Sequence, residues 1–175
     1  YVNNKWMIVS TSSSDLDGGS GRGVAAGGNN PAAIDTIEYI TISTQGNSID
    51  FGNLTATRQS QPGATGSSTR GVIGGGQSGS GPTTLNIIEF ITFASTGNAL
   101  DFGNLTDEKD QFGSCSNSIR GVFIAGRKNP SETSTNIMEY LTIATTGNSV
   151  DFGDMAYVSG NVGQITFNSN AHGGI

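Results

Sequence analysis

The sequence predicts an all-β protein made of tandem four-stranded units that form part of a β-propeller. Hydrophobic residues make up only 34% of the chain and charged residues 13%, while glycine fills 27 of 175 positions. A composition this poor in apolar residues can indicate disorder, but disordered chains lack periodic β-branched and aromatic runs. Here such runs recur at a fixed period of about fifty residues, so we predict a folded repeat protein with many turns.

Three short motifs define the repeat. They are an Arg-Gly-Val start, a glutamate between apolar residues, and an Asp-Phe-Gly end, found at Arg22, Arg70 and Arg120, at Glu38, Glu89 and Glu139, and at Asp50, Asp101 and Asp151. Successive copies are 48 to 51 residues apart. Self-similarity at a fixed period indicates tandem duplication. The motifs divide a single repeat domain, 1–175, into units 11–58, 59–108 and 109–157, with partial units at 1–10 and 158–175.

Each unit is predicted to contain four short strands. The first is rich in small residues, as in Gly113–Ser116, and the second is Arg-Gly-Val leading into glycines, as in Arg70–Gly76. The third, Asn86–Phe93, is apolar on both alternation phases, which is typical of a strand buried on both faces. A Gly97-Asn98 turn, a strong hairpin signal, leads into the fourth strand, Leu100–Gly103.

A four-stranded unit of this length cannot bury its middle strand alone, and radial stacking of such sheets gives a β-propeller. A solenoid and a stack of independent sheets are the alternatives. Closed propellers contain about four to eight blades, and three complete units are visible in this sequence. We therefore expect a fragment of a larger protein or a subunit of an assembly in preference to a small propeller closed by its own ends.

The units resemble kelch repeats. The glycines Gly74–Gly76, the aromatic Phe90 and the turn before Leu100 follow the kelch pattern of a glycine doublet, a spaced aromatic and a turn. The third unit departs from it, with Ile124-Ala125-Gly126 in place of the doublet. The amino-acid sequence of the repeat is similar to that of kelch-like repeats in structural proteins of marine bacteriophages. This resemblance implies blades of a propeller and a place in a virus particle.

Composition excludes several classes of function. The net charge is −6 and the sequence pI about 4.5, so no basic surface exists to bind nucleic acid. No apolar run is long enough for membrane insertion. Cys115 is the single cysteine, which excludes an internal disulfide and a cysteine-based zinc site.

The repeated charged residues are predicted to be structural. A carboxylate in a strand covered on both faces needs a partner, so we expect each glutamate to pair with an arginine of its own or the adjacent unit. The aspartates are expected to bond the backbone where the fourth strand ends. Active sites are rarely copied in every repeat, which disfavours a catalytic role for any of these positions.

Other motifs lack the chemistry they suggest at first sight. Asp15–Gly19 has too few acidic ligands for a calcium loop, and no helix or Lys-Ser/Thr follows Gly74–Gly81 to make a phosphate site. His172 is the only histidine, so neither a multi-histidine metal site nor a recognisable triad is present. We predict no catalytic, cofactor-binding or metal residue, no cofactor, and no enzymatic activity.

The resemblance to bacteriophage repeats, together with the lack of catalytic motifs, implies a structural or attachment protein of a virus particle, as a capsid decoration or a tail or fibre component. Its partners would be other virion proteins or copies of itself, and a host surface glycan or protein. The loops Gln77–Thr84 and Arg127–Thr135, which differ in sequence at one position of the repeat, are the candidate contact sites. The alternatives are a secreted or cellular kelch-type propeller that binds a carbohydrate or protein, and an enzyme with its active site in further blades.

Overall fold

The computed structural model is all-β and antiparallel. It describes residues 21–60, 62–79, 83–128, 131 and 133–156, which contain no helix, and hence none long and apolar enough to cross a membrane. The prediction of an all-β chain is confirmed. The predicted partial units at 1–10 and 158–175, the Asp15–Gly19 turn and His172 lie outside the described residues.

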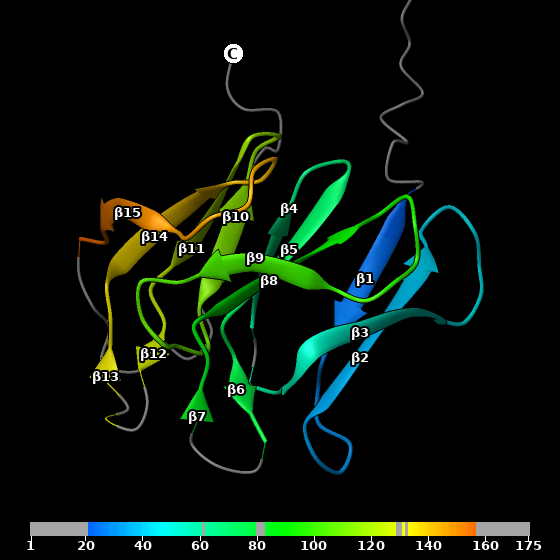
Figure 1. The fold of residues 1–175 in the computed structure, drawn as a ribbon, viewed down its shortest axis with the longest axis horizontal. Helices are drawn as coiled ribbons and strands as arrows, with labels where there is room; N and C mark the ends of the chain where they lie inside the picture. The colour runs from blue at the N-terminus through cyan, green and yellow to red at the C-terminus, as the bar shows by residue number, and fades with distance from the viewer. Residues whose placement is uncertain (1–20, 61, 80–82, 129–130, 132, 157–175) are drawn as a thin grey trace, which may run out of the picture.

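Each repeat unit forms one antiparallel sheet, and the three sheets follow one another in chain order (Figure 1). The second and third units are four-stranded, as predicted, and the first is three-stranded within the described residues. Their strands, in order across each sheet, are β1 (Arg22–Ala26), β2 (Ile34–Thr41) and β3 (Ile49–Arg58); β4 (Gly63–Gly66), β5 (Arg70–Gly74), β8 (Ile87–Thr92) and β9 (Leu100–Asn104); β10 (Gly113–Ser116), β11 (Arg120–Ile124), β14 (Ile137–Thr142) and β15 (Val150–Asp154).

The repeated sequence produces a repeated register. Val72 lies opposite Phe90 in the second unit, and Val122 lies opposite Tyr140 in the third. The pairing of the last two strands shifts immediately before the repeated glutamate in each unit, between Ile88 and Glu89 in the second, for example. Such a shift twists a strand locally and redirects its side chains, so the glutamate occupies the same special backbone position each time.

The loops between the second and third strands, which the sequence indicates only as connections, have secondary structure of their own. They contain two-stranded ribbons, formed by β6 (Gln77–Ser78) with β7 (Thr83–Thr84) and by β12 (Arg127–Lys128) with β13 (Thr133–Ser134). Single antiparallel bridges join each ribbon to the segment that leads from the preceding sheet into its own unit, Gln59 to Gln77 and Asp110 to Arg127. Two-residue strands carry no alternation signal of their own, and these bridges depend on residues far away in the sequence.

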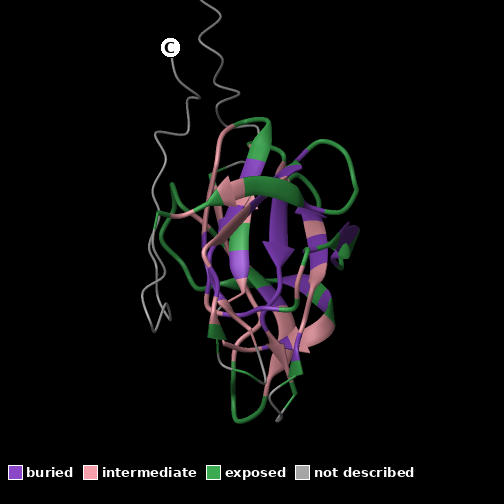
Figure 2. Ribbon diagram, turned by 90° about the vertical axis from the view of Figure 1, so that its left-hand side faces the viewer, coloured by how far each residue is buried: buried purple, intermediate pink, exposed green. Residues whose placement is uncertain are grey.

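The hydrophobic core lies between adjacent sheets. One cluster joins the first and second units through Phe51, Leu54, Ile73 and Ile91, among others. The other joins the second and third units and is built around Phe102, Leu105, Phe112, Phe123, Leu141 and Ile143. Figure 2 shows that the buried residues lie mainly along the inner strands. The described strands do not form a closed propeller, because the first and third sheets stand at opposite ends of the row in Figure 1.

Candidate functional site

Adjacent units are held by a turn that binds the last strand of the unit before it. In the second unit, the Gly97 and Ala99 amides donate to the carbonyl oxygens of Phe51 and Asn53, at 2.7 and 2.8 Å. The Asn53 amide donates in return to Asn98 Oδ1 at 3.0 Å. We call this three-bond arrangement the joint.

The joint is repeated with the same atoms between the second and third units. Gly147 and Ser149 donate to the carbonyl oxygens of Phe102 and Asn104, at 2.7 and 2.9 Å, and the Asn104 amide donates to Asn148 Oδ1 at 3.0 Å. The glycine of Asp-Phe-Gly permits this approach: at Gly103, a Cβ would lie 2.3 Å from the carbonyl oxygen of Gly147. The Gly-Asn turns predicted as hairpin turns are therefore also the contacts between units.

The repeated glutamate of the second unit bonds residues of the first unit, next to the first joint. Glu89 is fully buried and pairs with the buried guanidinium of Arg58, at 2.9 Å. The Thr55 amide donates to Glu89 Oε1 at 2.9 Å, and the Thr55 hydroxyl bonds the same oxygen. Arg58 also donates to the carbonyl oxygen of Gly75 at 2.8 Å. Burial raises the pKa of Glu89, although Arg58 and Thr55 oppose that effect.

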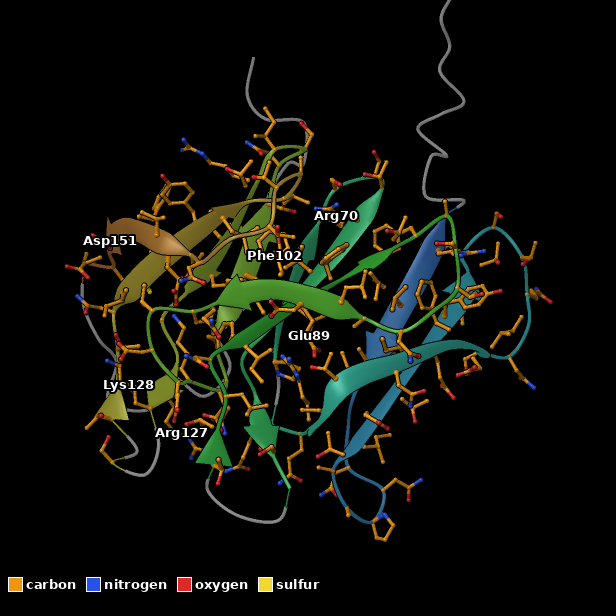
Figure 3. All side chains as sticks on the ribbon, viewed as in Figure 1. Arg70, Glu89, Phe102, Arg127, Lys128 and Asp151 are labelled. Atoms are coloured by element: carbon orange, nitrogen blue, oxygen red, sulfur yellow. The ribbon has the colours of Figure 1, made fainter. Side chains whose placement is uncertain are left out.

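The third unit repeats this arrangement with a different cation. Glu139, also fully buried, pairs with Lys109 Nζ, and it accepts hydrogen bonds from the Thr106 amide at 2.8 Å and the Ser149 hydroxyl at 2.5 Å. Burial would raise the pKa of Glu139, but Lys109 and these two donors outweigh it and hold the pKa below its ordinary value. Figure 3 places Glu89, the equivalent residue of the second unit, within the sheets and away from the outer ends.

The expected pairing with an arginine of the same or the adjacent unit is confirmed for Glu89, through Arg58, and is wrong for Glu139, which pairs with Lys109. The Arg-Gly-Val arginines do not pair with the glutamates. Their guanidinium groups lie over the aromatic ring of the third strand instead, 4.3 to 4.7 Å from its centroid, in the pairs Arg22–Tyr39, Arg70–Phe90 and Arg120–Tyr140. Two of them also reach the next unit: Arg22 donates to the Phe93 carbonyl oxygen and Arg70 to that of Ile143, the latter at 2.9 Å. The arginines thus add a second contact across each joint.

The remaining repeated acids differ among the units. Glu38 is exposed and accepts a hydrogen bond from the Ser48 hydroxyl at 2.9 Å. Asp151 accepts one from the Gly153 amide at 3.1 Å, the local backbone bond expected of the repeated aspartates. Asp50 and Asp101 are exposed and make no such bond among the described residues. All three lie inside the last strand of the unit, not at its end.

The two ribbons lie at the bottom of Figure 1 and differ from each other in sequence. In the third unit, Arg127 makes a two-pronged ion pair with the buried Asp110, at 3.1 and 3.2 Å, and Lys128 Nζ lies 2.5 Å from Asp107. Figure 3 shows both basic residues on this ribbon. The second unit has the neutral Gln77 at the corresponding place, bonded to Gln59 in the segment that follows β3. Both ribbons are anchored in the same way, but one carries neutral side chains and the other carries basic side chains.

The other polar groups and cavities of the described chain do not assemble into a reactive centre. Within the described residues, no three His, Cys, Asp or Glu side chains lie close enough to hold a metal ion. Burial raises the pKa of the Cys115 thiol, which disfavours the reactive thiolate. A cavity of about 280 Å³ between the first and second sheets is lined mainly by apolar residues, and its Arg22 and Thr65 already bond the carbonyl oxygens of Phe93 and Cys115.

The fold and its joints therefore define a repeat protein of serially packed antiparallel sheets. No family model matches the chain, and no curated protein matches it either.

Proposed function

We propose that the chain is a non-enzymatic structural or attachment protein of a virus particle, built from kelch-like blades that belong to a propeller or a larger assembly of units. The observation that carries the proposal is the joint. Two successive copies use the same three hydrogen bonds, a buried ion pair and a hydrophobic cluster, so the units form a rigid scaffold. A rigid scaffold that carries variable ribbons at one end suits attachment or decoration.

The ribbons supply the contact surface in this proposal. Their residues differ between units while their anchoring bridges are kept. Surfaces of this kind change partner specificity without disturbing the sheets below them. The resemblance to kelch-like repeats of bacteriophage structural proteins supplies the location, the virus particle, and the partners, which are other virion proteins, copies of the chain or a host surface group.

The location is tested on the source particle. An antibody raised against the chain should detect it in purified virions after density-gradient sedimentation and should label the capsid surface or the tail in immunogold images. Detection only in the particle-free fraction would refute the virion assignment. A glycan or protein ligand found for such a particle-free form would favour the secreted or cellular alternative.

The role of the ribbons is tested separately. Replacing only the tips of the ribbons, 79–82 and 129–132, by glycine-serine segments keeps the anchoring residues Gln77 and Arg127. It should abolish binding to host cells or to the partner virion protein and leave the circular dichroism spectrum unchanged. The matched control replaces 67–69, the turn between β4 and β5, which Figure 1 shows at the opposite end of the sheets. Equal loss of binding in both variants would contradict a specific role for the ribbons.

A further inference from the structure

The two outer surfaces of the row of sheets expose residues whose counterparts are buried in the joints. On the first unit, Ile40 is 46% exposed and Ile42 is 68% exposed. At the position of Ile40, Ile91 and Leu141 are each only 3% exposed, because each packs in a cluster shared with the preceding unit. Among the described residues, the first unit therefore presents a copy of this surface that no other unit covers, whereas it is covered in the other two.

The third unit presents the opposite half of the same contact. Phe152 is 49% exposed, whereas the equivalent Phe51 and Phe102 are each 2% exposed. Like them, Phe152 packs edge-to-face on the aromatic ring of its own unit, Tyr140. Its ring is therefore already held in the orientation that the joints use.

The first unit has a hollow that matches such a ring. A groove of about 290 Å³ is lined by Gly23, Val24, Ala25, Glu38, Tyr39, Ile40 and Ser48. Three of these residues, Ala25, Ile40 and Ser48, occupy the repeat positions of Ile73, Ile91 and Ala99. In the second unit those three residues form one hydrophobic cluster with Phe51 of the first unit. The groove is thus the first unit's copy of the place that receives the phenylalanine of a preceding strand.

The backbone groups of the two outer surfaces match as well. The exposed Gly46-Asn47-Ser48 turn repeats the donors and the amide side chain of the two joint turns. On the third unit, a Cβ at Gly153 would meet nothing within 4 Å among the described residues, although the equivalent atom of Gly52 or Gly103 would meet the next turn. The strand that contains Gly153 is open where its two counterparts are occupied.

We propose that a second copy of this chain binds head to tail, with the Gly46-Asn47-Ser48 turn of one copy on β15 of the other and Phe152 in the groove beside Ile40. The contact joins two different surfaces, so it continues into a row or closes into a ring. This inference goes beyond the proposed function, because it concerns how copies join and holds for any partner of the ribbons.

The contact between copies is weaker than the joints within the chain. Ala156 stands where Thr55 and Thr106 donate to a glutamate, and the sequence has Ser159 at the position of the cations. Glu38 therefore enters the contact with the Ser48 hydroxyl of its own unit but without the threonine hydroxyl and the cation that a preceding strand supplies in the joints, and a buried carboxylate without a counter-charge is unfavourable. Association then depends on concentration, and Glu38→Gln should tighten it several-fold.

The test is sedimentation velocity of the whole chain over a wide range of concentrations. The mean mass should rise with concentration from that of one 17.9 kDa chain. Phe152→Asp and Ile40→Asp should each raise the dissociation constant about 30-fold or more, as expected for a central apolar contact. Leu100→Asp is the matched control, since Leu100 is 60% exposed and belongs to neither outer surface. Asn47→Ala removes only the side-chain acceptor of the turn. It is a milder variant that should also weaken association if the aspartate variants misfold.

A mixture of the two aspartate variants tests whether the contact is head to tail. Each has one damaged and one intact surface, so a mixture of Phe152→Asp with Ile40→Asp should form dimers that cannot grow further. A wild-type chain that stays monomeric at every concentration would overturn the proposal. So would a wild-type chain that associates while the mixed variants, folded by circular dichroism, stay monomeric. Neither result bears on whether the chain belongs to a virion, which the particle experiments test.

Discussion

Replacing Gly103 with alanine tests the joint at its closest contact. The added Cβ would lie 2.3 Å from the carbonyl oxygen and 2.5 Å from the carbonyl carbon of Gly147. Because both are backbone atoms, the turn itself must move, and that movement disturbs the 2.7 Å bond from the Gly147 amide to Phe102. Overpacking of this kind costs about 1–3 kcal/mol. The positive φ of 150° at Gly103 adds a strain of order 1–3 kcal/mol.

Gly153→Ala is the matched control. It lies at the same repeat position with a φ of 129°, but its Cβ would meet nothing within 4 Å among the described residues. This variant carries the backbone strain without the collision, so we expect it to lose about 1–3 kcal/mol. The difference between the two variants isolates the close approach at the joint.

The measurement is urea unfolding followed by circular dichroism, at a protein concentration where the chain is monomeric. With an m value of about 1–3 kcal/mol/M, the two variants should differ in midpoint by about 1 M. If their unfolding free energies agree within about 0.5 kcal/mol, the usual error of such comparisons, the joint does not form as described.

Three further predictions concern charged groups. Glu139→Gln leaves Lys109 buried without its counter-charge and should cost about 3–5 kcal/mol in urea unfolding, and less when Lys109→Met is also present. The folded pKa of Glu139 lies below its ordinary value of 4.5, so its contribution to the free energy of unfolding is present above pH 4.5 and is lost as the pH falls through the folded pKa. Thermal stability in acid should therefore fall more steeply for wild type than for Glu139→Gln. The raised pKa of Glu89 has the opposite effect on stability. Its contribution to the free energy of unfolding is fully present below pH 4.5 and is lost as the pH rises through the folded pKa, and Glu89→Gln should lack this decline. Finally, Arg70→Ala should cost about 1 kcal/mol more than Arg120→Ala, because Arg70 also donates to a carbonyl oxygen across a joint; equal losses would contradict that contact.

The strands could be predicted from the sequence because each carries its signal locally. Gly113–Ser116 and Leu100–Asn104 match the predicted first and fourth strands closely. The fourth strand pairs with the strong third strand next to the Gly-Asn turn, and these two features fix its register. The ribbons escaped prediction because two-residue strands have no periodicity. Their anchoring bridges form only after adjacent units have packed.

The ion pairs show where reasoning from motifs failed. Each glutamate was predicted to pair with an arginine of its own or the adjacent unit, which is confirmed for Glu89 and wrong for Glu139. The actual cations, Arg58 and Lys109, differ in type and lie outside the repeated motifs. One signal was present, since each lies eight residues after a repeated aspartate, Asp50 or Asp101. The two units keep a positive charge at this position but not the same amino acid, so a comparison of the units by charge would have identified it.

The joints also set the order in which the described units come apart. Each joint links neighbours only, so the middle unit is fastened on both sides, while the outer two are each fastened on one. Free energies of local opening in such rows grow with the number of neighbours. Amide hydrogens of β8 should therefore exchange with solvent more slowly than those of β2 and β14. Fraying from both ends would leave the central sheet as the last cooperative element to melt.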